Sequence, residues 1–204
     1  MTIILILTLT LYSIIGGFLS GLFVYHIIKR QTKPHRLPTL YPIDVSMDCL
    51  FTVREKEAII ESLLMWQEAT CGLITFHIVN TGNNKLIYNE KERKTASYAI
   101  NFIRALDEDQ EVKESDERWK KRVLGFAQGF EPCGLAFIVA DRNINRRTFV
   151  ATCAHEVGHL LGLCHHPSKN ALMYEYICQP GPTQLDLQEL VNIWRSELNR
   201  KSQL

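Results

Sequence analysis

The fold is decided by residues 154–165, which read Ala154-His155-Glu156-Val157-Gly158-His159-Leu160-Leu161-Gly162-Leu163-Cys164-His165. Residues four apart lie on one face of a helix, so His155 and His159 can present two imidazoles to one metal ion. Gly162 can end the helix because glycine adopts the left-handed conformation without steric cost, and the chain can then bring back His165. Three histidines and one open position are the ligand set of a catalytic zinc, whereas structural zinc is closed by four protein ligands.

Glu156 has a different role from its neighbours. It follows His155 directly and so lies about 100° further around the helix, which makes it a poor third ligand. Its carboxylate can still reach a water molecule bound to the ion and act as a general base. The pattern H-E-x-x-H alone is short enough to arise by chance, but Gly162 and His165 each add a position with its own physical role.

The composition is that of an ordinary globular chain. Its 204 residues suit one domain, with or without a membrane segment. The net charge of +1 does not indicate binding to nucleic acid. The six cysteines are spread along the chain without a C-x-x-C pair, so we do not expect a cysteine-ligated zinc. Their number alone does not establish disulfides.

The first 28 residues predict a transmembrane anchor. Residues 2–28 carry no formally charged side chain. As a helix they would be roughly 40 Å long, more than the ~30 Å hydrocarbon core of a bilayer. A cleaved signal peptide is the alternative, but its apolar region is usually shorter and follows a basic segment. We therefore expect a single-pass membrane protein that contacts the lipid bilayer through residues 2–28, with a linker at 29–42.

The side of the membrane is set by the charges that follow the anchor. Lys29, Arg30, Lys33 and Arg36 come directly after the apolar run. By the positive-inside rule they favour a cytoplasmic position for the remaining domain, residues 43–204.

That domain is expected to belong to the α+β class. Alternating and β-branched residues predict strands at 43–51, 73–79, 98–106, 123–130 and 135–140. Thr52 and Glu55 have capping-box spacing and predict a helix that ends at Cys71-Gly72. The helix with the histidine motif should begin between Asn145 and Thr148, and Thr183 should cap a last helix.

The segment 107–122 is a dense run of mixed charge. Such a run is usually a solvated loop or helix face. Acidic clusters can also bind Ca²⁺, but no calcium-ligand loop is recognisable, so calcium is unsupported.

The histidine motif, followed by Ala171-Leu172-Met173-Tyr174, resembles the metzincin metalloproteases, and its distance to Met173 matches the matrixin (matrix metalloproteinase) branch. The resemblance implies a metzincin-type zincin domain, in which a twisted mixed sheet is joined by an active-site helix and a C-terminal helix. It implies one catalytic Zn²⁺ held by His155, His159 and His165, with Glu156 as the catalytic base. Met173 would be the Met-turn methionine, an apolar floor beneath the zinc.

The resemblance also implies a site for an extended protein or peptide substrate. In the family, an edge strand pairs with the substrate backbone. The segment of this chain that is similar to that strand consists of Leu124, Gly125, Phe126 and Ala127. Tyr174 and Glu175 would line the adjoining pocket. Matrixins usually have proline where Glu175 stands, which leaves the substrate preference open. Relatives usually act outside the cell, in conflict with the charge rule, so the side of the membrane also stays open.

These features predict a membrane-anchored zinc endopeptidase, in which Glu156 takes a proton from the zinc-bound water that attacks the peptide bond. The alternative is a catalytically inactive, zinc-binding metzincin relative that acts as a membrane-tethered interaction module. The intact Glu156 disfavours this alternative, because an inactive relative can lose that residue without losing metal. A third reading is a membrane-tethered adaptor with an incidental histidine cluster.

Overall fold

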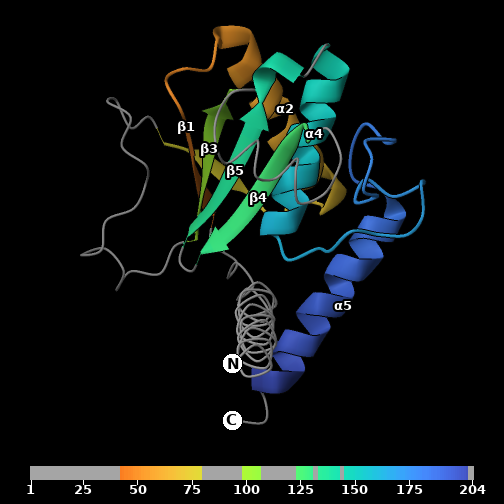
Figure 1. Cartoon of the computed structure of the whole chain (residues 1–204). Helices are drawn as coiled ribbons and strands as arrows, with labels where there is room; N and C mark the ends of the chain where they lie inside the picture. Colours follow the sequence, from red (N-terminus) through yellow and green to blue (C-terminus); the bar gives the residue numbers. More distant parts are fainter. Residues whose placement is uncertain (1–41, 80–97, 107–122, 131–132, 143–144, 202–204) are drawn as a thin grey trace, which may run out of the picture. The chain divides into compact units, whose positions relative to one another are not determined.

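The computed structural model describes residues 42–79, 98–106, 123–130, 133–142 and 145–201. In chain order the elements are β1 (Ile43–Met47), α2 (Val53–Ala69), β2 (Phe76–Ile78), β3 (Ala99–Ala105), β4 (Gly125–Phe130), β5 (Cys133–Val139), a 3₁₀ turn η2 (Ala140–Arg142), α4 (Arg146–Leu160) and α5 (Gln184–Lys201). Figure 1 shows them coloured along the chain.

The described strands form one mixed sheet in the order β2-β1-β3-β5-β4. Neighbouring strands are parallel except for β4, which runs antiparallel to β5 at one edge. The structure is a mixed α/β fold, in which the predicted mixed sheet, motif helix and last helix are all present. Among the described residues β4 is an edge strand and lies next to α4, so this edge of the sheet lies close to the histidine motif.

One hydrophobic core joins the sheet to the helices. It contains Ile100 and Phe102 of β3, Ile59 and Trp66 of α2, and Val157 of α4, all fully buried. The indole Nε1 of Trp66 donates a hydrogen bond of 2.8 Å to the carbonyl oxygen of Ala154 in α4. Trp66 therefore fixes α2 against the turn of α4 that carries the first histidine of the motif.

The predicted capping box at Thr52 and the predicted start of the motif helix between Asn145 and Thr148 are confirmed. The Thr52 hydroxyl accepts from the Glu55 backbone N–H, and the Glu55 carboxylate accepts from the Thr52 N–H, which is a complete capping box. Asn145 is the N-cap of α4, and its side-chain oxygen accepts from the N–H of Thr148 at 2.9 Å.

Two strands are shorter than their apolar runs predicted. β1 ends at Met47 because the side chain of Asp48 accepts the N–H of Leu50 and turns the chain. β2 begins only at Phe76, because the Thr70 hydroxyl accepts the N–H of Ile74 and holds the preceding residues in a turn. In both places a local bond from side chain to backbone competes with strand pairing.

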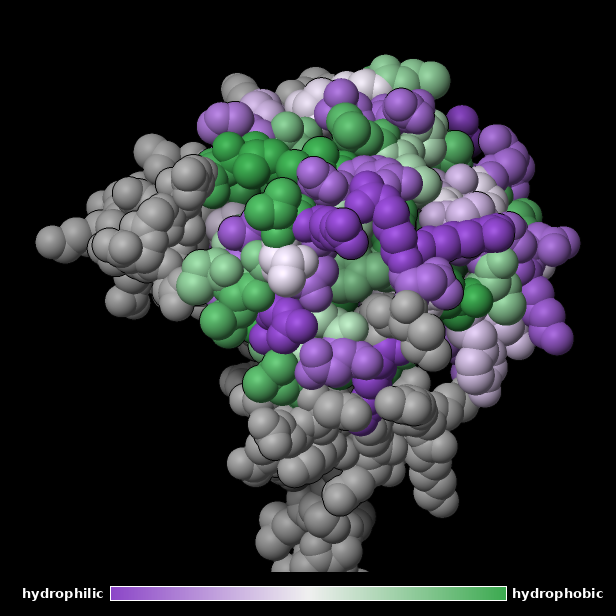
Figure 2. Space-filling view, turned by 90° about the horizontal axis from the view of Figure 1, so that it is seen from above, coloured by the Kyte–Doolittle hydropathy of each residue, from purple (hydrophilic) through white to green (hydrophobic). Residues whose placement is uncertain are grey.

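The prediction of a single-pass membrane protein is wrong. In the part of the chain that the structure describes, no helix is long and apolar enough to span a bilayer. The helices α2, α4 and α5 have 17, 15 and 18 residues and all carry charged side chains, whereas a span needs about 20 mainly apolar residues. The surface seen in Figure 2 mixes polar and apolar side chains.

Several predictions fall on residues outside the described part. They are the anchor at 1–28, most of the linker at 29–42 and the charged run at 107–122, with the calcium site considered for it.

Candidate metal centre

The helix α4 places two histidines of the motif on one face. His155 lies in the middle of the helix and is buried, and His159 follows one turn later and is half-buried. Their ring centroids are 4.8 Å apart. The i, i+4 spacing read from the sequence therefore produces the expected pair of imidazoles.

The end of α4 brings in the third histidine. The helix ends in a Schellman motif, in which the N–H of Leu163 donates to Gly158 O and the N–H of Gly162 donates to His159 O, both at 3.0 Å. Gly162 has a φ of 98°, the left-handed conformation predicted for it. The chain reverses at this residue, and the exposed His165 returns with its ring 4.7 Å from that of His159.

Backbone carbonyls orient the two helical imidazoles. Nδ1 of His155 lies 2.9 Å from the carbonyl oxygen of Leu172, and Nδ1 of His159 lies 2.9 Å from that of Leu163. A carbonyl oxygen only accepts, so each Nδ1 carries the proton and each Nε2 keeps its lone pair. This second contact is what fixes the tautomer and ring orientation of metal-binding histidines.

The ligand atoms of the three histidines converge to within 4.8 Å of one another. The Nε2 atoms of His159 and His165 are 3.2 Å apart. Two nitrogen ligands at the usual zinc distance of about 2.0–2.1 Å and a tetrahedral angle would be about 3.4 Å apart. The triad therefore fits one zinc ion, and its three nitrogens leave a fourth position for water or substrate.

Burial keeps the two helical histidines in the form that binds metal. Loss of hydration lowers the pKa of His155 from 6.5 to about 4 and that of His159 to about 3. Neighbouring imidazoles of the triad lower both pKa values further, and the carbonyl partners oppose the shift. Both rings are thus neutral at physiological pH, as zinc ligands must be.

Glu156 lies in dry surroundings beside the triad. The residue is 4 % exposed, and its Oε2 atom is buried without a hydrogen-bond partner among the described residues. Burial raises the pKa of its carboxyl group from 4.5 to about 8. A carboxylate with so little hydration is a stronger base than one in water.

The raised pKa of Glu156 predicts how its own contribution to the stability of the metal-free protein depends on pH. Between pH 4.5 and 8 the folded state holds a proton on Glu156 that the unfolded state releases, so the contribution of Glu156 to the free energy of unfolding falls as pH rises. Glu156→Gln removes this loss. The gain is the free energy of unfolding of Glu156→Gln minus that of the parent. This difference should increase by about 3 kcal/mol between pH 5.5 and 7.5. Urea unfolding of both proteins with a chelator present measures this gain, and a gain independent of pH would contradict the raised pKa.

The loop after His165 packs against α4. Met173 is fully buried, and its sulfur atom packs against Gly158 of α4. The N–H of His166 donates to the carbonyl oxygen of Met173 at 2.7 Å, which closes the loop. Through Leu172 O, the residue before Met173 also orients His155.

Asp186 holds this loop, a role that was not predicted from the sequence. It is fully buried near the start of α5, and its carboxylate accepts the N–H groups of Leu172 and Met173 at 2.9 and 3.0 Å. The same carboxylate accepts the N–H and hydroxyl of Thr183, both at 2.7 Å. The pattern Thr183-x-x-Asp186 is a helix-start signature, which was the available signal for this residue.

The predicted substrate residues belong to two segments of the chain. Gly125, Phe126 and Ala127 belong to β4, and Leu124 directly precedes it. Among the described residues β4 pairs with β5 alone. Tyr174 and Glu175 follow Met173; Tyr174 is half-buried with its ring 5.7 Å from that of Tyr176, and Glu175 is exposed.

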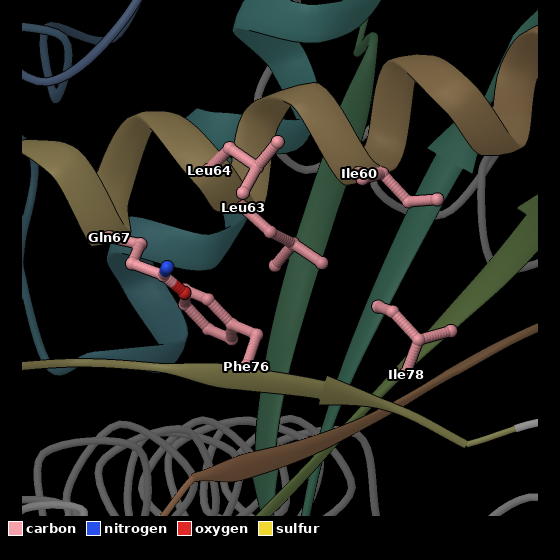
Figure 3. Close-up of a pocket in the computed structure, with 6 residues that line it drawn as sticks. All are labelled: Ile60, Leu63, Leu64, Gln67, Phe76 and Ile78. Carbon is pink, nitrogen blue, oxygen red and sulfur yellow. The ribbon is translucent and has the colours of Figure 1, made fainter. Parts of the chain in front are cut away.

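A small apolar hollow lies elsewhere, between α2 and β2. It is lined by Ile60, Leu63, Leu64, Gln67, Phe76 and Ile78 and has a volume of about 60 Å³. Figure 3 shows the side chains of α2 facing those of β2 across it. The lining contains none of the predicted site residues.

The chain was compared with protein families, curated proteins and solved structures. The family model described as matrixin matches residues 39–193. Among solved structures, the chain is similar to an archaemetzincin from Methanopyrus kandleri, with 12% identity and a TM-score of 0.45 over 76% of this chain and 96% of that one. No curated protein matches the sequence.

Proposed function

Because this chain belongs to the matrixin family, we propose that it is a zinc-dependent endopeptidase. The observation that carries the proposal is the triad of His155, His159 and His165, whose ligand atoms lie within 4.8 Å of one another beside a buried glutamate. We assign the three histidines as zinc ligands, Glu156 as the catalytic base and Met173 as the Met-turn methionine.

Each group has one task in the proposed hydrolysis. Zinc, when bound, supplies a Lewis acid that lowers the pKa of water and polarises the scissile carbonyl group. Glu156 accepts a proton from the attacking water and returns it to the nitrogen of the leaving amine. The carbonyl oxygens of Leu172 and Leu163 keep His155 and His159 in their metal-binding tautomers.

The edge strand β4 is the proposed platform for the substrate. It hydrogen-bonds to β5 on one side and contacts α4. An extended peptide can add to such an edge through main-chain hydrogen bonds, which hold an internal segment of a chain. We therefore assign residues Leu124–Ala127 to substrate binding and place Tyr174 and Glu175 on the wall of the adjoining pocket. This mode of binding supports endopeptidase rather than exopeptidase action.

The test is digestion of an unstructured protein by the zinc-loaded chain, with mass spectrometry of the products. The proposal expects cuts inside the substrate chain and their loss when a chelator is added. Stepwise shortening from one end would contradict endopeptidase action. Zinc binding without any cleavage would instead favour the non-catalytic interaction module.

A further inference from the structure

Gly125 of β4 lies directly against the side chain of Glu156. A Cβ atom at position 125 would be 2.9 Å from Cγ2 of Thr152, 3.0 Å from the carbonyl oxygen of Phe137 and 3.1 Å from Oε1 of Glu156. Non-bonded carbon contacts have their optimum at about 3.5–4.0 Å, so even a methyl group would crowd all three neighbours.

Space, and not backbone conformation, is the reason for glycine at this position. In the described part of the chain the glycines with positive φ are Gly72 and Gly162. Gly125 instead lies within a regular strand, opposite Ile138 of β5. Any residue could adopt its conformation, but a side chain would meet the helix α4.

The three neighbours of Gly125 differ in how far they can move away from an added methyl group. The oxygen of Phe137 belongs to the backbone of β5. Thr152 is β-branched and its hydroxyl donates to Thr148 O at 2.9 Å, so its methyl group is held in place. Glu156 is unbranched, and its Oε2 atom has no hydrogen-bond partner among the described residues. A methyl group at position 125 would therefore displace the carboxylate of Glu156.

Two hydrogen bonds to residues at the start of β4 hold this strand in place. The guanidinium of Arg142 donates to Val123 O at 2.8 Å, and the N–H of Val139 donates to Leu124 O at 3.0 Å. These bonds tie the start of β4 to β5 and η2, and so limit how far Gly125 can retreat from α4.

We propose that Gly125 is a positioning residue for Glu156: its missing side chain leaves the space in which the carboxylate lies between β4 and α4. Packing, rather than hydrogen bonding to Oε2, then sets the position of the base. This inference rests on the proposed function, because it assumes that the position of Glu156 limits the rate of hydrolysis.

The first test compares Gly125→Ala with the parent at equal zinc content. The expected kcat is lower by about tenfold to a hundredfold, the effect of a misplaced catalytic group, while KM changes by no more than about threefold. Thr152→Ser removes the methyl group at 2.9 Å and keeps the hydroxyl, so Gly125→Ala/Thr152→Ser should recover part of kcat. Unchanged kcat in Gly125→Ala, or no recovery in the double variant, would overturn the proposal.

Gly134→Ala is the matched control. A Cβ atom there would lie 2.6 Å from Cδ2 of Leu160 and 2.9 Å from the hydroxyl of Tyr98, but Glu156 is not among its near neighbours. This variant should melt at a lower temperature than the parent. Its kcat should stay within about twofold of the parent value, because the clash does not involve Glu156. An equal loss of kcat in both glycine variants would mean that Gly125 acts only through stability.

A second readout does not depend on peptidase activity. The Gly125→Ala substitution should lower the melting temperature less in a Glu156→Ala background, where the carboxylate at 3.1 Å is missing, than in the parent. Equal shifts in the two backgrounds would overturn the proposal. If the parent shows no peptidase activity but the shifts differ, the proposed function fails and the steric role of Gly125 stands.

Discussion

Replacing Asp186 by alanine is expected to reduce the free energy of unfolding of the metal-free protein by about 4 kcal/mol. The carboxylate is fully buried and accepts four hydrogen bonds, from the backbone of Leu172, Met173 and Thr183 and from the Thr183 hydroxyl. Alanine would leave buried N–H groups without partners, each at a cost of about 1–3 kcal/mol. Urea unfolding with a chelator present measures the loss.

Asp186→Asn is the matched control, because it keeps the volume but only one side-chain oxygen. That oxygen can replace Oδ2, which accepts three of the four bonds, so the loss should be clearly smaller than for alanine. Both variants should also weaken zinc binding, by about tenfold to a hundredfold for alanine, since Leu172 orients His155. A loss of stability below about 1 kcal/mol in the alanine variant would refute this role of Asp186.

Glu156→Ala is expected to lower kcat/KM for peptide cleavage by about 10²–10⁴-fold while the protein still binds one zinc ion. The substitution removes the proposed proton acceptor and leaves all three histidines of the triad in place. Steady-state cleavage of a quenched fluorescent peptide, with zinc content determined on the same sample, measures both quantities.

Two further variants separate loss of the base from loss of packing. Glu156→Gln fills the same space without a basic carboxylate and should be as inactive as alanine. Glu57→Ala removes an exposed acid on α2 and should keep the parent activity. If Glu156→Gln cleaved peptide at the parent rate, Glu156 would not be the base.

The meeting of the three imidazoles could be predicted because it depends on local geometry. The spacing of His155 and His159 is a property of one helix, and the reversal before His165 needs only Gly162 in the left-handed conformation. The capped starts of α2 and α4 were predictable for the same reason, since each cap involves residues three apart.

Contacts between distant segments could not be read from the sequence. The carbonyl oxygen of Leu172 faces His155 across 17 residues, and the indole of Trp66 reaches Ala154 across 88. The contact between Gly125 and Glu156 likewise depends on β4 lying beside α4, which follows from strand order and not from any local pattern. The apolar run at 2–28 led to a membrane localisation that the described helices contradict.

Zinc titration of the metal-free chain of 204 residues, followed by measurement of its peptidase activity, tests the central claim most directly. The proposed site has three histidine ligands that fit one ion. Activity should therefore rise linearly and stop rising at one equivalent of zinc per chain, and His159→Ala should show neither tight binding nor activity. Cleavage by the metal-free chain, or one tightly bound zinc per chain without any cleavage, would contradict the assignment of this protein as a zinc endopeptidase.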